Sequence, residues 1–380
     1  MSEISQLAAG DRPLVEIDLA AVARNWQAVR AAYTGPRLGA VVKNDAYGLG
    51  LARIGPWLAQ QGCRDFWVAT FAEALALRTA LAGGPVPQPR IFVLHGIAGA
   101  SVADFVRHAV VPVLAGPGEI ATARAHAAAT GVALPVAVHL DTGLTRLGLD
   151  RKALAALAED PASLQGLDVQ AWVTHLGRFS DPDSEHSLSQ RDRLLEWTGL
   201  LPAAARSIAT SSSVFAGPHW HLELGRVGSA LYGVDTTPQR PQPIEPAVTF
   251  SAPVLHVAQV PAGTEVGYAG NGITAAACTL ATLALGYGDG MPFSLVNRGH
   301  VLIDGRPAPI VGGVSMGFVS VDVSAFAPGQ VRAGSRAEVF GAGQRLEQLA
   351  ADAGIAPNVL LLATASRAAR RYIATAEVAA

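Results

Sequence analysis

Cysteine is nearly absent from this sequence. Cys63 and Cys278 are the two cysteines among 380 residues, and neither has a histidine or another cysteine nearby at the spacing of a metal site. The chain therefore has neither a disulfide framework nor a zinc-binding motif, and no metal is expected. Because disulfides belong to oxidising compartments, their absence also favours an intracellular protein.

An excess of positive charge and a long apolar run are missing as well. The formal net charge is -2, and lysine and arginine are spread along the chain, which gives no basic surface for nucleic acid. The most apolar run, residues 275–285, is shorter than the ~20 residues that span a bilayer. Residues 1–11 lack the basic start and apolar centre of a secretory signal. We expect a soluble cytoplasmic protein without a membrane or nucleic-acid partner.

Apolar residues, in contrast, make up 50% of the chain and follow an ordered pattern. Between residues 13 and 240, short apolar or β-branched runs such as 38–43 and 134–141 alternate with helical patterns such as 71–81 and 117–129. This alternation predicts parallel strands joined by crossover helices. About eight such units in roughly 230 residues favour a (β/α)8 barrel of the TIM type over an open sheet.

The pattern changes after the proline-rich segment 238–246. Short strands separated by glycine and proline follow, and helical periodicity is nearly absent until the C-terminus. We therefore predict an α/β fold in which a barrel domain, residues 13–240, precedes a β-rich C-terminal domain, residues 241–380.

A lysine stands where one barrel strand is expected to end. In V-V-K-N-D-A-Y-G-L-G, residues 41–50, Lys43 directly follows an apolar run. The active site of such a barrel lies at the carboxyl ends of its strands, where His139, Asp141 and His175 are also expected. Lys43 is either a solvated turn residue or an amine that forms a Schiff base with an aldehyde, because a partly desolvated lysine has a lowered pKa and attacks carbonyl groups.

The neighbourhood of Lys43 resembles the pyridoxal-phosphate signature of alanine racemases, V-K-A-N-A-Y-G-H-G. Further motifs that resemble those of the same family follow in the same order along almost the whole chain. They are H-L-D-T-G-L-T-R-L-G (139–148), V-T-H-L (173–176), L-G-R-V-G-S-A-L-Y-G (224–233), E-V-G-Y-A-G (265–270), L-G-Y-G-D-G (285–290) and P-I-V-G-G-V-S-M-G (309–317). Many short motifs in the right order are more specific than any one alone.

The resemblance implies an isomerase that depends on pyridoxal 5'-phosphate, an amino-acid racemase with alanine as the favoured substrate. Lys43 would bind the cofactor covalently and act as one acid/base group, and Tyr268 would act as the other. Racemisation needs two opposed groups because a proton taken from one face of the alpha carbon must return to the opposite face. In this family the tyrosine comes from the neighbouring subunit, so a head-to-tail homodimer is expected.

The resemblance also assigns residues around the cofactor and the substrate. Arg226 matches the arginine that faces the pyridine nitrogen. Its guanidinium keeps its own protons and can only donate, which leaves that nitrogen unprotonated and the ring a weaker electron sink, as suits proton transfer without transamination. His175 matches a histidine beside the ring. The expected phosphate contacts are Tyr47, Ser211 and the backbone N–H groups of Gly228 and Ser229, and the expected substrate contacts are Arg146 and the N–H of Met316.

The sequence departs from the family at His139, where many members carry a carbamylated lysine that steadies the arginine matched by Arg146. Imidazole forms no stable carbamate of that kind, so Arg146 must be oriented by another group, for which Asp141 is a candidate. At the expected substrate entrance, larger or charged residues of the family are replaced. The replacing residues are Phe293, Gly313, Gly317 and Ser366. The changes indicate either neutral drift or a wider and less polar entrance.

Three functions stay open on the sequence alone. The first is alanine racemisation. The second is a related pyridoxal-phosphate enzyme that acts on a bulkier amino acid, as a broad-specificity racemase or an aldolase for beta-hydroxy amino acids. The third is a non-catalytic cofactor-binding protein, against which the second domain and Tyr268 both count. The basic tail, residues 367–372, is expected to be a charged helix or loop face in solvent.

Overall fold

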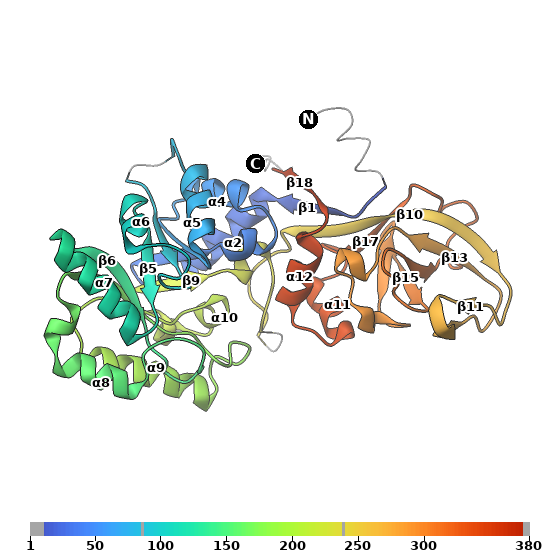
Figure 1. Ribbon diagram of the computed structural model, residues 1–380. Coiled ribbons are helices and arrows are strands. Elements are labelled where there is room, and N and C mark those ends of the chain that lie inside the picture. Colours follow the sequence, from blue (N-terminus) through green and yellow to red (C-terminus); the bar gives the residue numbers. More distant parts are fainter. Residues whose placement is uncertain (1–10, 85–86, 238–239, 375–380) are drawn as a thin grey trace.

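The computed structural model describes residues 11–84, 87–237 and 240–374. Residues 1–10, on which most of the expectation about a secretory signal depends, lie outside these ranges, as do Pro238 and Gln239 of the proline-rich segment. Figure 1 shows two bodies joined side by side, a helix-covered barrel from the first part of the chain and a β-rich body from the second. Within the described ranges, each helix falls short of the length and hydrophobicity needed to cross a membrane.

The barrel is a sheet of 8 strands in the order β8-β7-β6-β5-β4-β3-β2-β9, with parallel pairing throughout. The two end strands meet where the N–H of Arg226 donates to the carbonyl oxygen of Ala209 at 2.9 Å. The strands are β2 (Arg37–Val41), β3 (Asp65–Val68), β4 (Arg90–Val93), β5 (Val111–Leu114), β6 (Leu134–His139), β7 (Leu167–Val173), β8 (Ala205–Ser207) and β9 (Leu224–Val227).

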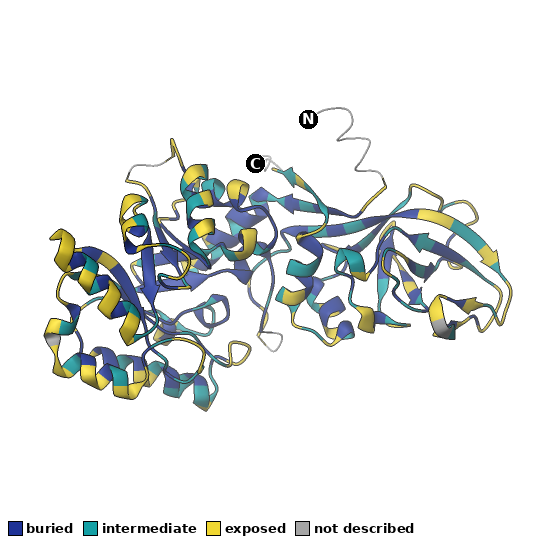
Figure 2. Ribbon diagram, in the orientation of Figure 1, coloured by how far each residue is buried: buried dark blue, intermediate teal, exposed yellow. Residues whose placement is uncertain are grey.

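Helices cover the outside of this barrel. In Figure 2 the barrel strands are mostly buried, and the helices around them turn exposed faces outward. The helices of this part of the chain are α2 (Leu19–Ala32), α4 (Leu51–Gln60), α5 (Phe71–Ala80), α6 (Val102–Arg107), α7 (Pro117–Thr130), α8 (Arg151–Glu159), α9 (Glu185–Thr198) and α10 (Ser211–Val214), with short 3₁₀-helices at Pro161–Leu164, Pro218–Trp220 and Ser229–Tyr232. The element α3 (Lys43–Tyr47) is a single turn with left-handed backbone angles at residues 44–46. The helices expected at 71–81 and 117–129 are confirmed as α5 and α7.

Local signals in the sequence account for the ends of these two helices. Helix α5 begins with a capping box, in which Thr70 and Glu73 each accept a hydrogen bond from the backbone N–H of the other at 3.2 Å. Helix α7 has Pro117 in its first turn and ends at Gly131, whose φ of 67° suits a residue without a Cβ.

The second body is a sheet of 8 strands in the order β13-β16-β15-β14-β17-β10-β1-β18, and β10 also pairs with β13. Strand β1 comes from the start of the chain and β18 from its end. The elements are β1 (Leu14–Asp18), β10 (Val248–Val260), β11 (Glu265–Val266), β12 (Gly272–Ile273), β13 (Cys278–Leu283), β14 (His300–Ile303), β15 (Arg306–Val311), β16 (Val319–Asp322), β17 (Arg336–Phe340), α11 (Leu346–Ala353), α12 (Pro357–Ala365), β18 (Ala369–Ile373) and 3₁₀-helices at Tyr268–Gly270, Tyr287–Asp289 and Phe293–Leu295.

A continuous hydrophobic core joins the two bodies. It includes Val22 and Leu231 on the barrel side and Phe250 and Phe340 in the second sheet, all of them fully buried. The rings of Phe250 and Phe340 lie 5.5 Å apart between centroids. The predicted barrel followed by a β-rich domain is therefore confirmed as the fold class, while the division at residue 240 stays a prediction.

The prediction for the basic tail was wrong, because residues 369–373 form strand β18 in parallel register with β1. Two of its arginines have acidic partners: Arg370 pairs with Asp45 at 2.7 Å, and Arg371 pairs with Glu16 of β1. Charge alone favoured a solvated face, but hydrogen bonding to the free edge of β1 satisfies the backbone of this segment and decided its structure.

Candidate active site

The carboxyl ends of neighbouring barrel strands bring several predicted residues together. Lys43 follows β2 by two positions, His139 ends β6, His175 follows β7 by two positions, and Arg226 lies in β9. The charges of these side chains act on one another, since both arginine and lysine charges lower the pKa of His175. The mouth of the barrel is thus the place where most of the predicted chemistry lies.

Arg226 is held in one orientation by the barrel. It is buried, and its guanidinium donates hydrogen bonds to the hydroxyl of Ser207 and the carbonyl oxygen of Thr174. Burial lowers the pKa of Arg226 to about 10, which still leaves the side chain protonated at neutral pH. A guanidinium is a donor only, so this group can donate to a ligand atom but cannot accept a proton from it.

Lys43 has an environment that favours its neutral amine. Loss of water on burial lowers its pKa most, the positive charges of Arg146 and Arg226 lower it further, and Glu73 acts in the opposite direction. A larger fraction of the amine is therefore unprotonated at a given pH than for a lysine in water, which makes Lys43 a better nucleophile and base.

The backbone after Lys43 forms a single left-handed turn. Asn44, Asp45, Ala46 and Tyr47 have φ values of 54°, 54°, 54° and 59°. Each such residue costs roughly 1–2 kcal/mol relative to the right-handed form, although asparagine and aspartate accept the conformation more readily than others. The surrounding structure must hold this turn, and a strained backbone held in this way is a frequent feature of functional sites.

The residues predicted to hold a phosphate group converge from three elements. The hydroxyl of Ser211, at the start of α10, accepts hydrogen bonds from the N–H groups of Gly228 at 3.0 Å and Ala230 at 3.2 Å. Gly228 is placed so closely that a Cβ there would overlap the hydroxyl of Tyr47. Ser229 begins the next 3₁₀-helix. Hydroxyls and backbone N–H groups of this kind suit an anion with several acceptor oxygens.

Two histidines in the barrel mouth are held neutral by their surroundings. Burial and then the charges of Arg226 and Arg146 lower the pKa of His175 well below its usual range, and burial lowers the pKa of His139 to about 4. The Nδ1 atom of His139 is buried and has no hydrogen-bond partner within the part of the chain that the structure describes. At neutral pH neither imidazole contributes a charge.

Asp141 shapes the loop that carries Arg146 and does not pair with its guanidinium. The Oδ1 atom of Asp141 accepts hydrogen bonds from the backbone N–H groups of Gly143, Leu144 and Thr145, at 3.1, 3.0 and 2.9 Å. Arg146 itself is exposed. These hydrogen bonds end at Thr145, so the orientation of Arg146 by Asp141 stays a prediction.

The predicted residues of the second body, Tyr268 and Met316, lie outside the barrel that carries Lys43. The N–H of Gly288 donates to the carbonyl oxygen of Met316 at 2.8 Å, which joins the loop of Tyr287 to that of Met316. The side chains of Tyr268 and Met316 are 78% and 66% exposed. Tyr268 follows β11, which lies at the end of the molecule opposite the barrel in Figure 1. One chain alone therefore does not bring Tyr268 to Lys43.

Sequence reasoning missed the residues that hold Arg226. Ser207 ends β8, Thr174 follows β7, and Trp67 of β3 places its ring centroid 5.4 Å from the guanidinium carbon of Arg226. The available signal was only their position at or near strand ends in the barrel, because serine and threonine are ordinary residues there and a buried tryptophan is normally assigned to the core.

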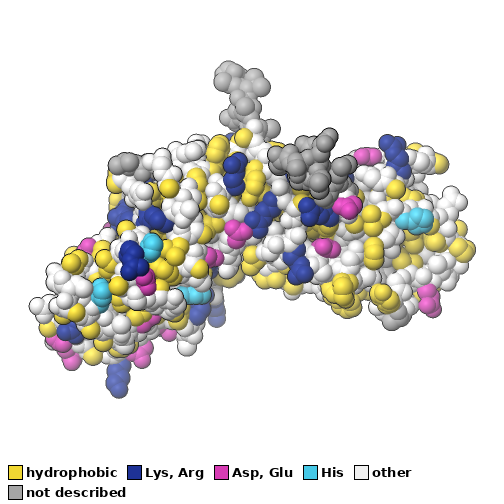
Figure 3. Space-filling view, turned by 45° about the horizontal axis from the view of Figure 1, so that its top comes forward, with side chains coloured by type: hydrophobic (Ala, Val, Ile, Leu, Met, Phe, Trp, Pro, Cys, Tyr) yellow, Lys and Arg dark blue, Asp and Glu magenta, His cyan; other side chains and the backbone are white. Residues whose placement is uncertain are grey.

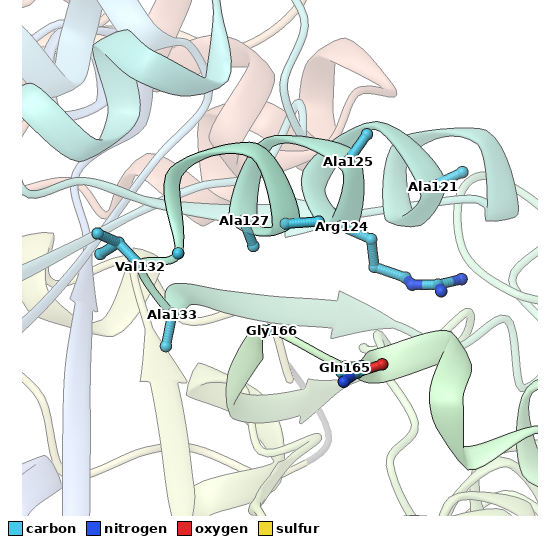
Figure 4. Close-up of a pocket in the computed structure, with 10 residues that line it drawn as sticks. Ala121, Arg124, Ala125, Ala127, Val132, Ala133, Gln165 and Gly166 are labelled. Carbon is cyan, nitrogen blue, oxygen red and sulfur yellow. The ribbon is translucent and has the colours of Figure 1, made fainter.

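A separate groove of about 630 Å³ lies on the outside of the barrel, and the residues that line it do not include the predicted site residues. Figure 4 shows helix α7 above this groove, with the side chains of Arg124 and Gln165 toward the same end. Alanine and glycine make up most of its lining, so the groove lacks the convergent polar groups that fix a small ligand.

Comparison with known proteins gives a match over nearly the whole chain. The sequence model described as "Alanine racemase, N-terminal domain" matches residues 17–236, and that described as "Alanine racemase, C-terminal domain" matches residues 247–372. The alanine racemase of Acidiphilium cryptum is 40% identical over 347 residues, which are 90% of this chain and 94% of that protein. The alanine racemase of Brucella canis is 35% identical over 380 residues, 97% of this chain and 94% of that protein.

Solved structures of alanine racemases are also similar to this chain over nearly its whole length. The crystal structure of alanine racemase from Bartonella henselae with covalently bound pyridoxal phosphate gives a TM-score of 0.89 at 31% identity, over 95% of this chain and 99% of that one. Alanine racemase from Streptomyces coelicolor A3(2) also gives a TM-score of 0.89, at 30% identity, over 95% of this chain and 98% of that one.

Proposed function

Since this chain belongs to the alanine racemase family, we propose that it interconverts L- and D-alanine by a proton transfer shared between Lys43 and Tyr268. The family depends on pyridoxal phosphate. One observation supports this function above the others: the Lys43 amine, with its lowered pKa, lies in the same barrel mouth as the buried donor Arg226.

The residues present fit the cofactor. When bound, pyridoxal phosphate supplies an electron-withdrawing ring that acidifies the alpha C–H of an attached amino acid. The Lys43 amine would bind it covalently, and Tyr47, Ser211 and the N–H groups of Gly228 and Ser229 would hold its phosphate. Gly228 supports this arrangement, because any side chain there would overlap the Tyr47 hydroxyl.

Arg226 would donate a hydrogen bond to the ring nitrogen. Because Ser207 and Thr174 already fix the guanidinium and because it keeps its proton, Arg226 cannot protonate that nitrogen fully. With Arg226 as a donor only, the ring would withdraw electrons less strongly than a protonated ring. This limits side reactions at other carbon atoms and favours the return of a proton to the alpha carbon.

Two groups would move the proton on opposite faces of the substrate. Lys43 suits one face because its lowered pKa leaves more of the amine neutral and able to accept a proton than for a lysine in water. We assign the opposite face to the phenol of Tyr268 from a second subunit, with His175 beside it. His175 is held neutral, so it can accept a hydrogen bond without adding positive charge.

The head-to-tail homodimer in this proposal is supported by apolar side chains on the second body. Seven large hydrophobic residues between positions 255 and 318 are at least 41% exposed. They are Leu255, Tyr268, Ile273, Tyr287, Phe293, Met316 and Phe318. So many exposed apolar side chains on one body, with the rings of Tyr287 and Phe293 in contact, suit a protein partner. A second copy of the chain placed against them would bring Tyr268 to the partner's barrel mouth.

Arg146 and the backbone N–H of Met316 would bind the substrate carboxylate. The N–H of Met316 makes no hydrogen bond within the described residues, so it is available to an acceptor. Figure 3 shows basic and acidic side chains interspersed over the viewed face, as suits a small-molecule enzyme more than a protein that binds nucleic acid. From the sequence expectations we also propose a cytoplasmic location.

Incubation of the purified protein with a panel of L-amino acids in deuterated water tests this function. The expected result is exchange of the alpha proton together with inversion, fastest for alanine. Release of an aldehyde from a beta-hydroxy amino acid would identify an aldolase, and binding of pyridoxal phosphate without exchange would identify a non-catalytic protein. Either outcome would contradict the proposal.

A further inference from the structure

The left-handed turn after Lys43 is held from two sides by residues that the proposed mechanism does not use. On the barrel side, the N–H of Asn44 donates to Oε1 of Glu73 at 2.6 Å. The other carboxylate oxygen of Glu73 accepts from the N–H groups of Ala69 at 2.7 Å and Thr70 at 3.2 Å. Glu73 thus fixes the start of the turn to the end of strand β3.

On the other side, the contacts come from the last strand of the described chain. The guanidinium of Arg370 in β18 pairs with Oδ2 of Asp45 at 2.7 Å. The second oxygen of Asp45 accepts from the N–H of Leu51 at 2.7 Å. The hydroxyl of Tyr372 donates to the carbonyl oxygen of Leu49 at 2.8 Å. Arg370 and Tyr372 therefore contact the turn and the residues that follow it.

Two glycines let this C-terminal segment approach closely. A Cβ at Gly48 would lie 3.0 Å from the Cβ of Ala365 and from the backbone nitrogen of Ser366, and a Cβ at Gly50 would overlap the hydroxyl of Tyr372. Both glycines also have positive φ values, 82° and 96°. The turn and the C-terminal segment are therefore packed against each other without spare room.

We propose that Arg370 and Tyr372 are positioning residues for Lys43, which hold the left-handed turn through Asp45 and Leu49 and so fix the direction of the lysine side chain. The assignment of a reactive role to Lys43 rests on the proposed function. Deletion of these contacts would let the turn relax toward ordinary backbone conformations, and the amine would lose its fixed place in the barrel mouth.

The same contacts connect the two bodies of the molecule. Strand β18 pairs with β1, and β1 pairs on its other edge with β10 of the second sheet. That sheet belongs to the body that presents Tyr268. The backbone beneath Lys43 is thus tied, through Arg370 and β18, to the scaffold of the second acid/base group. A shift of one body against the other would be transmitted to the lysine turn.

Hydrogen exchange of the cofactor-free protein tests the proposal without use of its activity. The turn amides of Ala46, Gly48 and Gly50 donate to the carbonyl oxygens of Val42, Asn44 and Asp45, so their exchange reports opening of the turn. We expect exchange about two to five times faster in Arg370→Gln, and about ten times faster or more in Arg370→Gln/Tyr372→Phe. Arg370→Lys, which keeps a cation, should fall between wild type and Arg370→Gln.

Arg371→Gln is the matched control. Arg371 is the next residue on the same strand, but its guanidinium pairs with Glu16 of β1 and not with the turn. This variant should leave exchange at the turn unchanged. Equal acceleration in Arg370→Gln and Arg371→Gln, or acceleration of the β1 amides together with the turn, would show a general loosening of the sheet and overturn the proposal. Turn amides that exchange as in wild type in the double variant would overturn it as well.

A second readout concerns Lys43 directly. In the cofactor-free protein, the rate of reductive methylation of Lys43 should rise with pH as its amine, whose pKa is lowered, loses its proton. In Arg370→Gln/Tyr372→Phe this rise should occur at higher pH, because the amine gains water. Arg371→Gln should leave it in place. An unchanged pH profile in the double variant would contradict the positioning role. Failure of the wild-type protein to racemise alanine, together with a shifted profile in the double variant, would contradict only the proposed function.

Discussion

The guanidinium carbon of Arg226 lies 5.4 Å from the centroid of the Trp67 ring. Trp67 is fully buried and stacks on Phe92 with 4.2 Å between ring centroids. Arg226 is therefore held by an aromatic face in addition to its hydrogen bonds with Ser207 and Thr174. The guanidinium of Arg226 is therefore fixed in its orientation in the barrel mouth before a ligand binds.

Arg226→Lys should lower kcat/KM for L-alanine by more than tenfold. An ammonium is a compact charge that cannot reproduce the planar set of donors, so an acceptor in the buried site loses its partner. Steady-state racemisation measures the loss. Arg206→Lys is the control, since Arg206 lies in the neighbouring strand and pairs with Glu223 away from the site. Equal activity in wild type and Arg226→Lys would exclude a specific role for the guanidinium.

Gly228→Ala should weaken pyridoxal-phosphate binding by at least about tenfold. The added Cβ would overlap the Tyr47 hydroxyl, so the phenol would have to move away from the phosphate position. Titration of the cofactor-free protein gives the dissociation constant. Gly118→Ala, where a Cβ meets open space, should bind as wild type does. An alanine at 228 that leaves affinity unchanged would place the phosphate elsewhere.

Lys43→Met should stabilise the cofactor-free protein at neutral pH. The pKa of Lys43 is lowered on folding, so the native state binds its proton less tightly than the unfolded chain does. This penalty is largest well below the ordinary lysine pKa and disappears as the pH rises toward that value. Thermal unfolding should therefore show a gain of about 1–2 °C at pH 7 that shrinks toward pH 10. A gain that grows with pH would contradict the lowered pKa.

The entrance substitutions can be tested without a steric penalty. A Cβ at Gly317 meets open space, and one at Gly313 lies 3.7 Å from its nearest neighbour, the side-chain nitrogen of Asn271. Gly313→Arg/Gly317→Asp should therefore fold. It should also narrow the substrate range, since one extra methylene on the substrate changes the binding free energy in a tight pocket by about 1–3 kcal/mol. The comparison is kcat/KM for alanine, serine and a longer aliphatic amino acid. Equal selectivity in both proteins would show that these changes are drift.

The sequence predicts the barrel well because its signals are local and repeated. Apolar runs ending at His139 and before His175 have the length of strands, and the helix that follows Thr70 carries its own capping residues. Since parallel strands place their carboxyl ends at one mouth, Lys43, His139 and His175 could be assigned to the same place. The resemblance of several motifs, in the same order as in one family, then supplied Arg226 and the roles of these residues.

Long-range pairing could not be predicted in the same way. The basic residues of β18 look like a solvated tail, and only the free edge of β1, more than 350 positions away at Glu16 and Arg371, makes them a strand. The left-handed turn after Lys43 is another such case. Asparagine and aspartate allow that backbone conformation, but hydrogen bonds with Glu73 and Arg370 hold it. Both residues are distant from the turn in sequence, so no local pattern indicates these contacts.

Tyr268→Phe should retain the cofactor and lose about 100-fold or more in racemisation, as for other removed acid/base groups. Lys43→Ala should lose covalent attachment of the cofactor and all activity. Each homodimer is then nearly inactive for a different reason, and neither variant removes a residue of the buried core, because Tyr268 is 78% exposed and Lys43 is half-buried.

Mixing of subunits tests directly whether Lys43 of one subunit and Tyr268 of another form one active site. Lys43→Ala and Tyr268→Phe chains are refolded or expressed together in equal amounts. Half of the dimers are then mixed, and each mixed dimer has one intact site of two, so we expect recovery to about a quarter of wild-type activity. A mixture that stays as inactive as its two components would show that a single chain supplies both groups.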